Sequence, residues 1–336
     1  MTDFTLPMQY IRQIADLLAD MGVDLEQWLE PAGLNETVLA DMNWILTYEQ
    51  FQRLIFEAIR MSNEPALGLL VGERLRITSH GMLGFAAMNC ASLRQAIALF
   101  EDFVQLRFSL ISARLEVMDE EARVHFEVTQ PLAELEIPVL EAVVLTVKNL
   151  LDHISMGSCQ ISRISFAYPE PGYGGLARDL FKCQLHYDQS WNGLVLPLQV
   201  IDQSLEVADP SSFDEAARIC QRELEKRDAL TSLGDRVRRL MLDKQSGFPS
   251  LSVTARLLHM TPRTLHRRLK EEGTSYQIII DQVRRRLAVQ YLQTSKFTIQ
   301  EIAFNLGYTD PANFRRAFKR WENLSPSEYV KRHNET

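Results

Sequence analysis

The sequence predicts two domains of different fold class, an α+β domain over residues 1–205 and an all-α domain over residues 231–336. Three observations indicate this division. The length of 336 residues suits two ordinary domains better than one. Alternating hydrophobic patterns typical of strands occur only in the first part, whereas helical patterns occur throughout. The charge balance also reverses near residue 230: residues 231–336 carry 19 Lys and Arg against 10 Asp and Glu, and the rest carry 17 against 34.

The overall composition is that of a globular protein, with 46% hydrophobic and 24% charged residues. No apolar run approaches the roughly 18 residues that a membrane helix needs. The N-terminal sequence MTDFTLPMQY lacks a long apolar segment, so we expect no secretory signal, no membrane association and a cytoplasmic location. The cysteines are far apart in the sequence, and we expect reduced, mostly buried thiols rather than disulfides, a metal site or a cofactor site: Cys90, Cys159, Cys183 and Cys220.

Between residues 1 and 205 the pattern changes several times. Apolar residues recur at helical steps around 10–18 and 51–59. Residues 111–128 alternate between apolar and polar on both sides of an acidic turn, which predicts a β-hairpin. The segments that follow predict an apolar helix at 138–156, a strand with a Pro/Gly loop at 161–175, and a strand at 191–197 with a turn at Asn192-Gly193.

Residues 206–230 predict a linker helix between the domains. Ser212 and Glu215 have the spacing of a capping box, which marks a helix start. One apolar stripe follows, formed by Phe213, Ala217, Cys220 and Leu224. Such a narrow stripe suits either packing on the helix's own domain or a dimerisation or interdomain contact, and both uses stay open.

The second domain contains a helix-turn-helix pattern. A short apolar helix at 251–258 is followed by a turn at 259–261, and Pro262 stands where a second helix begins. Leu265 and Leu269 lie on one side of that second helix. The opposite side carries residues at positions i, i+3, i+4 and i+7, which are Arg263, His266, Arg267 and Lys270.

The same pattern returns about 50 residues later. Ala255 and Leu258 of the first unit correspond to Ala303 and Leu306 of the second, and Gly307 provides the turn. Ile302, Phe314 and Phe318 are expected to pack, while the exposed side of the last helix carries Ala312, Asn313, Arg315, Arg316 and Lys319. A long helix at 276–295 joins the units and would hold them at a fixed separation.

These residue types suit DNA recognition. Arg can bond guanine through two hydrogen bonds, Asn can bond adenine, and Lys or Arg at helix ends can reach phosphates. The net charge of the second domain, +9, favours binding to a polyanion. Two units at matching spacing indicate DNA binding more strongly than a single basic helix does.

At these residues the chain resembles the AraC/XylS family of bacterial transcription regulators. The resemblance covers about residues 231–333 and is most specific in IAFNLGYTDPANFRRAFKRWENLSPSEY. It implies seven helices, with recognition helices at about 262–271 and 311–321 reading adjacent major grooves of promoter DNA. The implied base-contacting residues are Arg263, Thr264, His266 and Arg267 in the first helix and Ala312, Asn313, Arg315 and Arg316 in the second. The sequence departs from the family pattern at Asn323, where glycine is common, and at Val330, where arginine is common.

Residues 1–205 resemble, more weakly, the arabinose-binding-like N-terminal domain of one branch of that family, which includes regulators of amino-acid use and of virulence. The likeness is carried by PALGLLVGERL, HGMLGFAAMNCASLRQAI and WNGLVLPLQVID. It implies a small-molecule effector and a homodimer. An amino acid and a fatty acid are both open as effector classes. The acidic balance favours a cationic ligand, whereas Arg107 and Lys148, close to apolar segments, could meet an anionic one.

Catalysis is not expected, because the sequence contains none of the common phosphate-loop, nucleophile-elbow or zinc-protease motifs. We interpret the carboxylates of the MDEEA turn as solvated. The histidines of the first domain are isolated in the sequence, and we interpret them as structural or surface residues: His80, His125, His153 and His186. The predicted function is a sequence-specific DNA-binding regulator that responds to a small effector and contacts RNA polymerase. The alternative is a DNA-binding factor that is constitutive or controlled by a protein partner.

Overall fold

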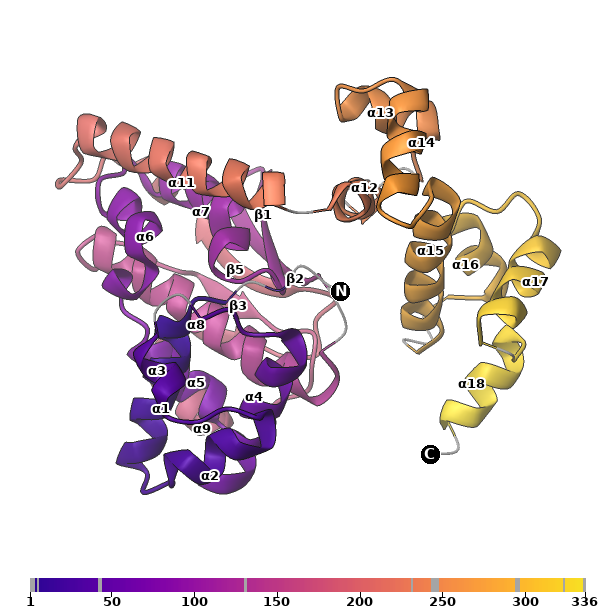
Figure 1. Cartoon of the computed structure of the whole chain (residues 1–336). Helices are drawn as coiled ribbons and strands as arrows, with labels where there is room; N and C mark the ends of the chain where they lie inside the picture. The colour runs from indigo at the N-terminus through magenta and orange to yellow at the C-terminus, as the bar shows by residue number, and fades with distance from the viewer. Residues whose placement is uncertain are drawn as a thin grey trace. The chain divides into compact units, whose positions relative to one another are not determined.

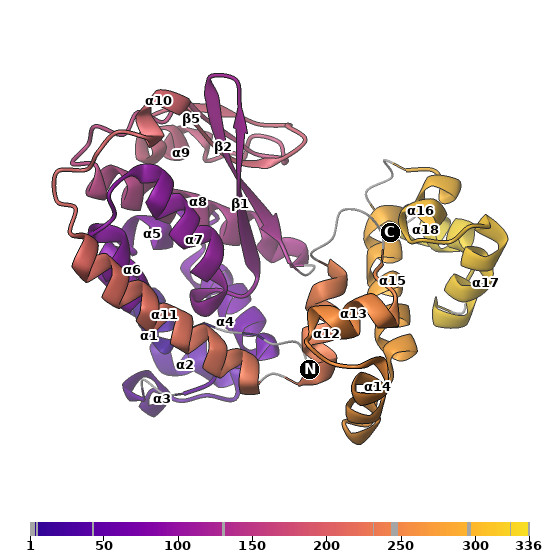
Figure 2. The ribbon, with the colours of Figure 1, turned by 90° about the horizontal axis from the view of Figure 1, so that it is seen from above.

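The computed structural model describes residues 4, 6–41, 44–129, 132–230, 232–242, 248–293, 297–322 and 324–334. The chain divides into two compact units at residues 226 and 227, and each is described by itself (Figures 1 and 2). The first is an α+β domain and the second is all-α, as the sequence predicts. No helix in the described part of the chain is long and apolar enough to cross a membrane.

The first domain surrounds its sheet with helices of very different length. The helices up to the first strand are α1 Met8–Asp20, α2 Leu25–Leu29, η1 Glu30–Ala32, α3 Thr37–Ala40, α4 Tyr48–Ser62, α5 Leu67–Arg74, η2 Ile77–His80, α6 Gly81–Met88 and α7 Leu93–Arg107. Those after it are η3 Ala133–Leu135, α8 Glu136–Ile154, α9 Gly174–Phe181, α10 Leu198–Ile201 and α11 Pro210–Leu230.

The sheet has the strand order β1-β2-β5-β3-β4. Its strands are β1 Ile111–Met118, β2 Glu121–Val128, β3 Arg163–Ser165, β4 Gln184–His186 and β5 Asn192–Pro197. Strands β1 and β2 form the predicted antiparallel hairpin, β5 pairs antiparallel with β2 and β3, and β4 pairs parallel with β3.

The predicted turn at Asn192-Gly193 is wrong, because both residues lie inside β5. Gly193 pairs with His125 of β2 and with Ser165 of β3. A Cβ atom at Gly193 would lie 2.0 Å from the carbonyl oxygen of Val124. The glycine therefore permits close approach of two strands rather than a change of chain direction.

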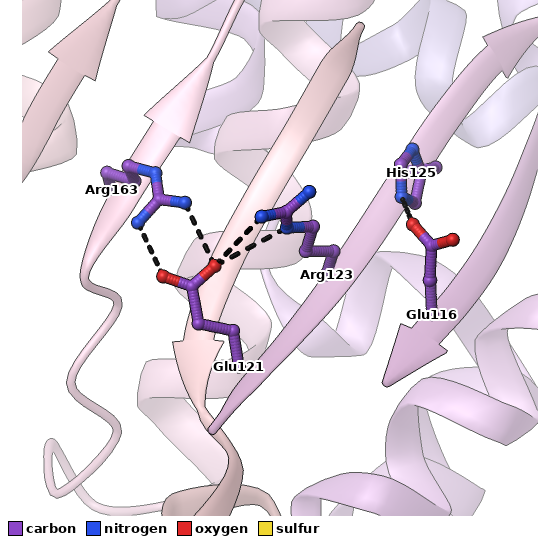
Figure 3. A network of polar contacts seen from close by, with 5 residues as sticks. All are labelled: Glu116, Glu121, Arg123, His125 and Arg163. Atoms are coloured by element: carbon purple, nitrogen blue, oxygen red, sulfur yellow. Dashed lines mark hydrogen bonds and ion pairs between the residues drawn. The ribbon is translucent and has the colours of Figure 1, made fainter. Parts of the chain in front are cut away.

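Polar side chains on one face of the sheet form a network (Figure 3). Arg163 donates two hydrogen bonds to the Glu121 carboxylate, at 2.8 and 3.0 Å, and Arg123 donates a further bond at 3.2 Å. These arginines lower the pKa of Glu121. His125 lies 2.8 Å from a Glu116 oxygen and stacks against Trp191. Glu121 is therefore held by two arginines besides being partly exposed, and His125 is a structural residue, in agreement with the interpretation of the histidines.

Helix α8 lies between the sheet and α5 in the centre of the first domain. It packs against β2 and β5 on one side and against α5 on the other. Gly68 and Gly72 of α5 make this approach possible, since a Cβ at either position would lie less than 3.0 Å from the backbone of α8. One continuous core results, which includes Leu140, Val144 and Phe166.

Helix α11, the predicted linker helix, packs on the first domain. Figures 1 and 2 both draw it alongside α6 and α7. Ala216 and Cys220 are buried in the core of that domain, and the remaining stripe residues Phe213, Ala217 and Leu224 pack against it. The helix starts earlier than predicted: Asp209, not Ser212, caps it by accepting hydrogen bonds from the backbone amides of residues 211 and 212.

The second domain consists of seven helices in its described residues: α12 Leu233–Leu242, α13 Leu251–Leu257, α14 Pro262–Glu271, α15 Tyr276–Gln293, α16 Ile299–Asn305, α17 Pro311–Glu322 and α18 Pro326–Asn334. It contains two small cores rather than one. Helix α15 contributes Ile279 and Val283 to the first core and Ala288 and Leu292 to the second. One helix therefore joins both cores, as the sequence predicts.

The cysteines form no disulfides in the described structure, and two further histidines of the first domain lie at its surface. All four cysteines are free, and three of them are buried while Cys183 is half-buried, as predicted. His153 and His186 are exposed. No group of three or more metal-binding side chains lies together in the part of the chain that the structure describes.

Candidate nucleic-acid interface and ligand cavity

The two helix-turn-helix units share their backbone hydrogen bonds. In the first, the amide of Met260 donates to the carbonyl of Ala255, at 2.8 Å, and in the second, the amide of Tyr308 donates to that of Ala303, at 2.9 Å. The turn residues His259 and Gly307 both have positive φ, at 54° and 74°. Both turns are therefore left-handed caps that end the first helix in the same way.

The second helix of each unit starts with a side-chain cap followed by a proline. Thr261 caps α14 by accepting a hydrogen bond from the amide of Thr264, and Asp310 accepts one from the amide of Ala312 at the start of α17. A proline follows each cap, at positions 262 and 311. From these prolines onward the two helices are in register at a spacing of 49 residues.

The candidate DNA-contacting side chains lie at equivalent positions on α14 and α17. Buried Leu265 and Leu269 in α14 correspond to buried Phe314 and Phe318 in α17. The opposite faces are exposed, and position by position they carry Arg263, His266, Arg267 and Lys270 in the first helix and Ala312, Arg315, Arg316 and Lys319 in the second. We call these eight residues the recognition faces.

The two remaining candidates, Thr264 and Asn313, lie beside the recognition faces. Thr264 is half-buried, and its hydroxyl lies 2.8 Å from that of Thr261, so it takes part in the helix cap. Exposed Asn313 accepts a hydrogen bond of 2.6 Å from Arg316. Arg267 makes only a long contact of 3.6 Å with Glu271. The two central arginines are thus held by groups of their own helices rather than by other elements.

Arg284 of α15 braces the second turn, a role that the sequence did not suggest. Its Nε donates to the carbonyl of Leu306, at 2.9 Å. Its guanidinium lies 4.7 Å from the ring centre of Tyr308 and 5.1 Å from that of Phe248. The basic run at 284–286 is a weak signal of this role, because the run also predicts a solvated face.

Further contacts connect α15 to α17. Arg320 pairs with Asp281 at 3.0 Å, and Arg285 pairs with Glu322 at 2.6 Å. Arg285 and Arg320 therefore hold α15 and α17 together. Of the two departures from the family pattern, Val330 packs against the second core, and Asn323 lies outside the described residues.

The first domain contains a cavity of about 120 Å³ among α1, α4, α5, α7 and α8. Its wall is almost wholly apolar, and its polar residues are Tyr10, His80, Arg107 and Thr146, whose hydroxyl donates to the carbonyl of Gly72. The hydroxyl of Tyr10 lies 2.8 Å from Nδ1 of His80. Burial and the charge of Arg107 lower the pKa of His80 to about 4, and burial raises the pKa of Tyr10.

His80 is thus a buried residue with a structural partner, Tyr10, and the two candidate cations differ. Lys148 pairs with Asp152 at 2.8 Å and does not line the cavity. Arg107 lines the cavity and has no ion pair among the described residues. The sequence predicted no cavity, although Arg107 in the last turn of an apolar helix was a partial signal.

A second polar group, Glu141, is buried on the other side of α8. Its carboxylate accepts hydrogen bonds from the hydroxyls of Tyr168, at 3.2 Å, and Tyr173, at 3.1 Å. Burial raises the pKa of Glu141 to about 7, against the opposing effect of these two hydrogen bonds. The aromatic residues at 166–187 thus enclose a carboxyl group.

Comparison with known proteins identifies the family to which the chain belongs. The family model described as the N-terminal arabinose-binding domain of AraC transcription regulators matches residues 22–205, and a helix-turn-helix domain model matches residues 254–332. A protein of Pseudomonas aeruginosa named ornithine utilization regulator is 32% identical over 324 residues, which cover 96% of each chain. The regulator VirS of Mycobacterium tuberculosis is 22% identical and covers 94% of this chain and 93% of its own.

Among solved structures, the transcriptional regulator CdpR from Pseudomonas aeruginosa is similar over 92% of this chain and 98% of its own, with 21% identity and a TM-score of 0.47. Both matched models fall on separate domains of the fold described above, the first on the α+β domain and the second on the helix-turn-helix units. The chain therefore belongs to the AraC family of DNA-binding transcription regulators and combines an arabinose-binding-like N-terminal domain with a helix-turn-helix domain.

Proposed function

We propose that the recognition faces of α14 and α17 read base pairs in adjacent major grooves of promoter DNA, and that a small molecule bound by the first domain controls this binding. The observation that carries the proposal is the common register of the two faces. The four exposed positions on α14 lie at the same spacing as the four on α17. In each helix the first of them directly follows the proline, Pro262 or Pro311. An α-helix fits the major groove, where arginine distinguishes guanine from the other bases.

The two faces predict different sequence preferences for the two half-sites. The third and fourth positions carry Arg and Lys in both helices, whereas the first two carry Arg and His in α14 but Ala and Arg in α17. Arg267 and Arg316 occupy the third position, near the centre of each face. We propose that these two arginines contact bases and that Lys270 and Lys319, near the helix ends, contact phosphates.

The experiment begins with the full chain selecting duplexes from a random pool, which provides the binding site. Arg267→Ala and Arg316→Ala should each weaken binding to the selected duplex by about 1–3 kcal/mol and relax the base preference at one position each, in different half-sites. Arg268→Ala is the matched control, because Arg268 is exposed on α14 outside the recognition face. Unchanged base preference in both variants would refute the assigned faces.

Effector control and assembly complete the proposal. The arabinose-binding-like domain supports control by a small-molecule effector. We propose that the protein is a cytoplasmic homodimer and that it contacts RNA polymerase. An effector acts only through different affinities for two states of the regulator, so it must change the affinity for the selected duplex. Sedimentation of the full chain over a wide concentration range tests the dimer, and a monomer throughout would contradict it. DNA binding that no small molecule alters would favour a constitutive or protein-controlled factor.

A further inference from the structure

The cavity of the first domain has an uncompensated polar end. Nε2 of His80 and Nε of Arg107 are buried and have no hydrogen-bond partner among the residues that the structure describes. A buried polar atom without a partner costs about 1–3 kcal/mol, and most such atoms in proteins are satisfied. Two of them in one cavity indicate a site whose ligand supplies the missing partners.

The backbone beside the cavity makes room for the Arg107 side chain. Gly81 directly follows His80 and has a φ of 55°. A Cβ at this position would lie 2.6 Å from a terminal nitrogen of Arg107. The guanidinium group therefore lies against the backbone next to His80, which brings the cation and the imidazole to the same end of the cavity.

The two unpartnered nitrogen atoms at this end of the cavity favour a ligand group that accepts hydrogen bonds. His80 is neutral at pH 7, since its pKa is lowered to about 4. When the Tyr10 hydroxyl donates to Nδ1, the ring hydrogen of His80 lies on Nε2, which becomes a donor like Nε of Arg107. A carboxylate accepts from both donors and neutralises the buried cation.

The rest of the cavity favours an apolar body and excludes a second charge. The wall contains aliphatic and aromatic side chains, among them Val71, Phe100, Val104 and Val143. No Asp or Glu is among the described residues that line it, so the ammonium group of an amino acid or polyamine would be buried without a partner. A volume of about 120 Å³ is close to that of an engineered apolar cavity of ~150 Å³ that binds benzene.

We propose that this cavity binds a small carboxylate whose apolar body is about the size of one benzene ring, with the carboxylate on Arg107 and His80. The proposal names the ligand class for the effector control proposed above, and its regulatory meaning rests on that control. Phenylacetate and hexanoate are suitable probes, each paired with its neutral alcohol and its amine, and ornithine represents the amino acids.

The test is calorimetric titration of the full chain with each probe. The carboxylates should bind, the alcohols should bind more weakly, and the amines and ornithine should not bind in the cavity. Arg107→Met should weaken carboxylate binding by roughly 30-fold or more, because it removes the charged partner, and should change alcohol binding by less than about threefold. Arg94→Met is the control, since Arg94 lies on the same helix, is exposed, and pairs with Asp202 away from the cavity.

A cavity-filling variant keeps the proposal testable if Arg107→Met fails to fold. Ala142→Phe places a ring in the cavity without removing its polar end, and it should abolish binding of carboxylates and alcohols alike. Carboxylate binding that survives Ala142→Phe, or equal affinity for carboxylates and alcohols in the wild-type chain, would overturn the proposal. Binding of ornithine in place of the carboxylates would also overturn it and would place the effector elsewhere in the first domain.

The affinity for the selected duplex, measured on the same samples, separates this inference from the proposed function. Carboxylate binding that requires Arg107 but leaves DNA affinity unchanged would support the cavity assignment and contradict effector control. A change in DNA affinity caused only by another class of molecule would support effector control and overturn the cavity assignment.

Discussion

The two domains place their ionisable side chains in opposite ways. The first domain buries Glu141, Lys148 and His80 in its interior. In the second domain, the residues of the recognition faces are exposed, and the described side chain that is both buried and polar is Thr254, which carries no charge. Buried ionisable groups make the folding of a domain sensitive to protons, whereas surface charges make its binding sensitive to salt. This difference agrees with the division of roles proposed above, in which the first domain binds the effector and the second binds DNA.

The largest expected effect concerns Glu141. Its pKa is about 7 in the folded domain and about 4.5 in the unfolded chain, so the unfolded state loses its proton first as the pH rises. The free energy of unfolding should therefore fall between pH 4.5 and 7, by about 3 kcal/mol from this group alone. Glu141→Gln should remove that fall. Thermal unfolding of the full chain between pH 5 and 8 measures the difference.

The control for this change is Glu134→Gln, because Glu134 is exposed in the same part of the chain. Its pH dependence should match that of the wild-type chain. Equal pH dependence of the wild type and Glu141→Gln would show that the buried carboxyl group does not distinguish the first domain.

Arg284 is a half-buried cation of the second domain with a structural role, so the second domain does not place all of its charges on the surface. Arg284→Met would leave the Leu306 carbonyl without its donor and remove two cation–π contacts, at a cost of about 1–3 kcal/mol. Hydrogen exchange of the full chain should show faster exchange at residues 306–310 and no change at 258–261. Arg268→Met is the control, since that side chain is exposed on α14, in the other unit. Faster exchange at both turns would contradict a local role.

A smaller effect is expected from exchanging the residue types of the two left-handed turns, because one turn contains glycine and the other contains histidine. Gly307 has a φ of 74°, so Gly307→Ala should destabilise the second unit by roughly 1–2 kcal/mol. His259 has a φ of 54°, so His259→Gly should be neutral or slightly stabilising. Hydrogen exchange at each turn measures both changes. Destabilisation by His259→Gly would show that the imidazole has a role besides tolerating the turn.

The smallest expected effect concerns a single surface charge. Lys319→Ala should weaken DNA binding across sequences and reduce the slope of log affinity against log salt by about one unit. Arg222→Ala, at an exposed position of the first domain, should leave that slope unchanged. Equal slopes for both variants would mean that the position of a charge on α17 does not matter.

The sequence predicted elements with strong local signals and missed features that depend on distant contacts. Helices α14 and α17 start at the predicted residues, because a cap and a proline mark each start locally. Gly193 was assigned to a turn because its role as a point of close approach depends on Val124, about 70 residues away. Strand β4 has three residues, too few for a periodic pattern. The cavity brings together residues between positions 6 and 147, a convergence that no local pattern contains.

The single helix α15, which enters both cores of the second domain, constrains how this domain can evolve. One residue added between Val283 and Ala288 would rotate one unit against the other by about 100° and separate them by only about 1.5 Å. DNA turns by about 35° for each base pair and rises by about 3.4 Å, so no change in operator spacing matches both quantities. With the two recognition faces reading adjacent grooves, as proposed above, substitutions in α15 can accumulate while its length cannot change, and the distance between half-sites should stay the same at every promoter that the protein binds.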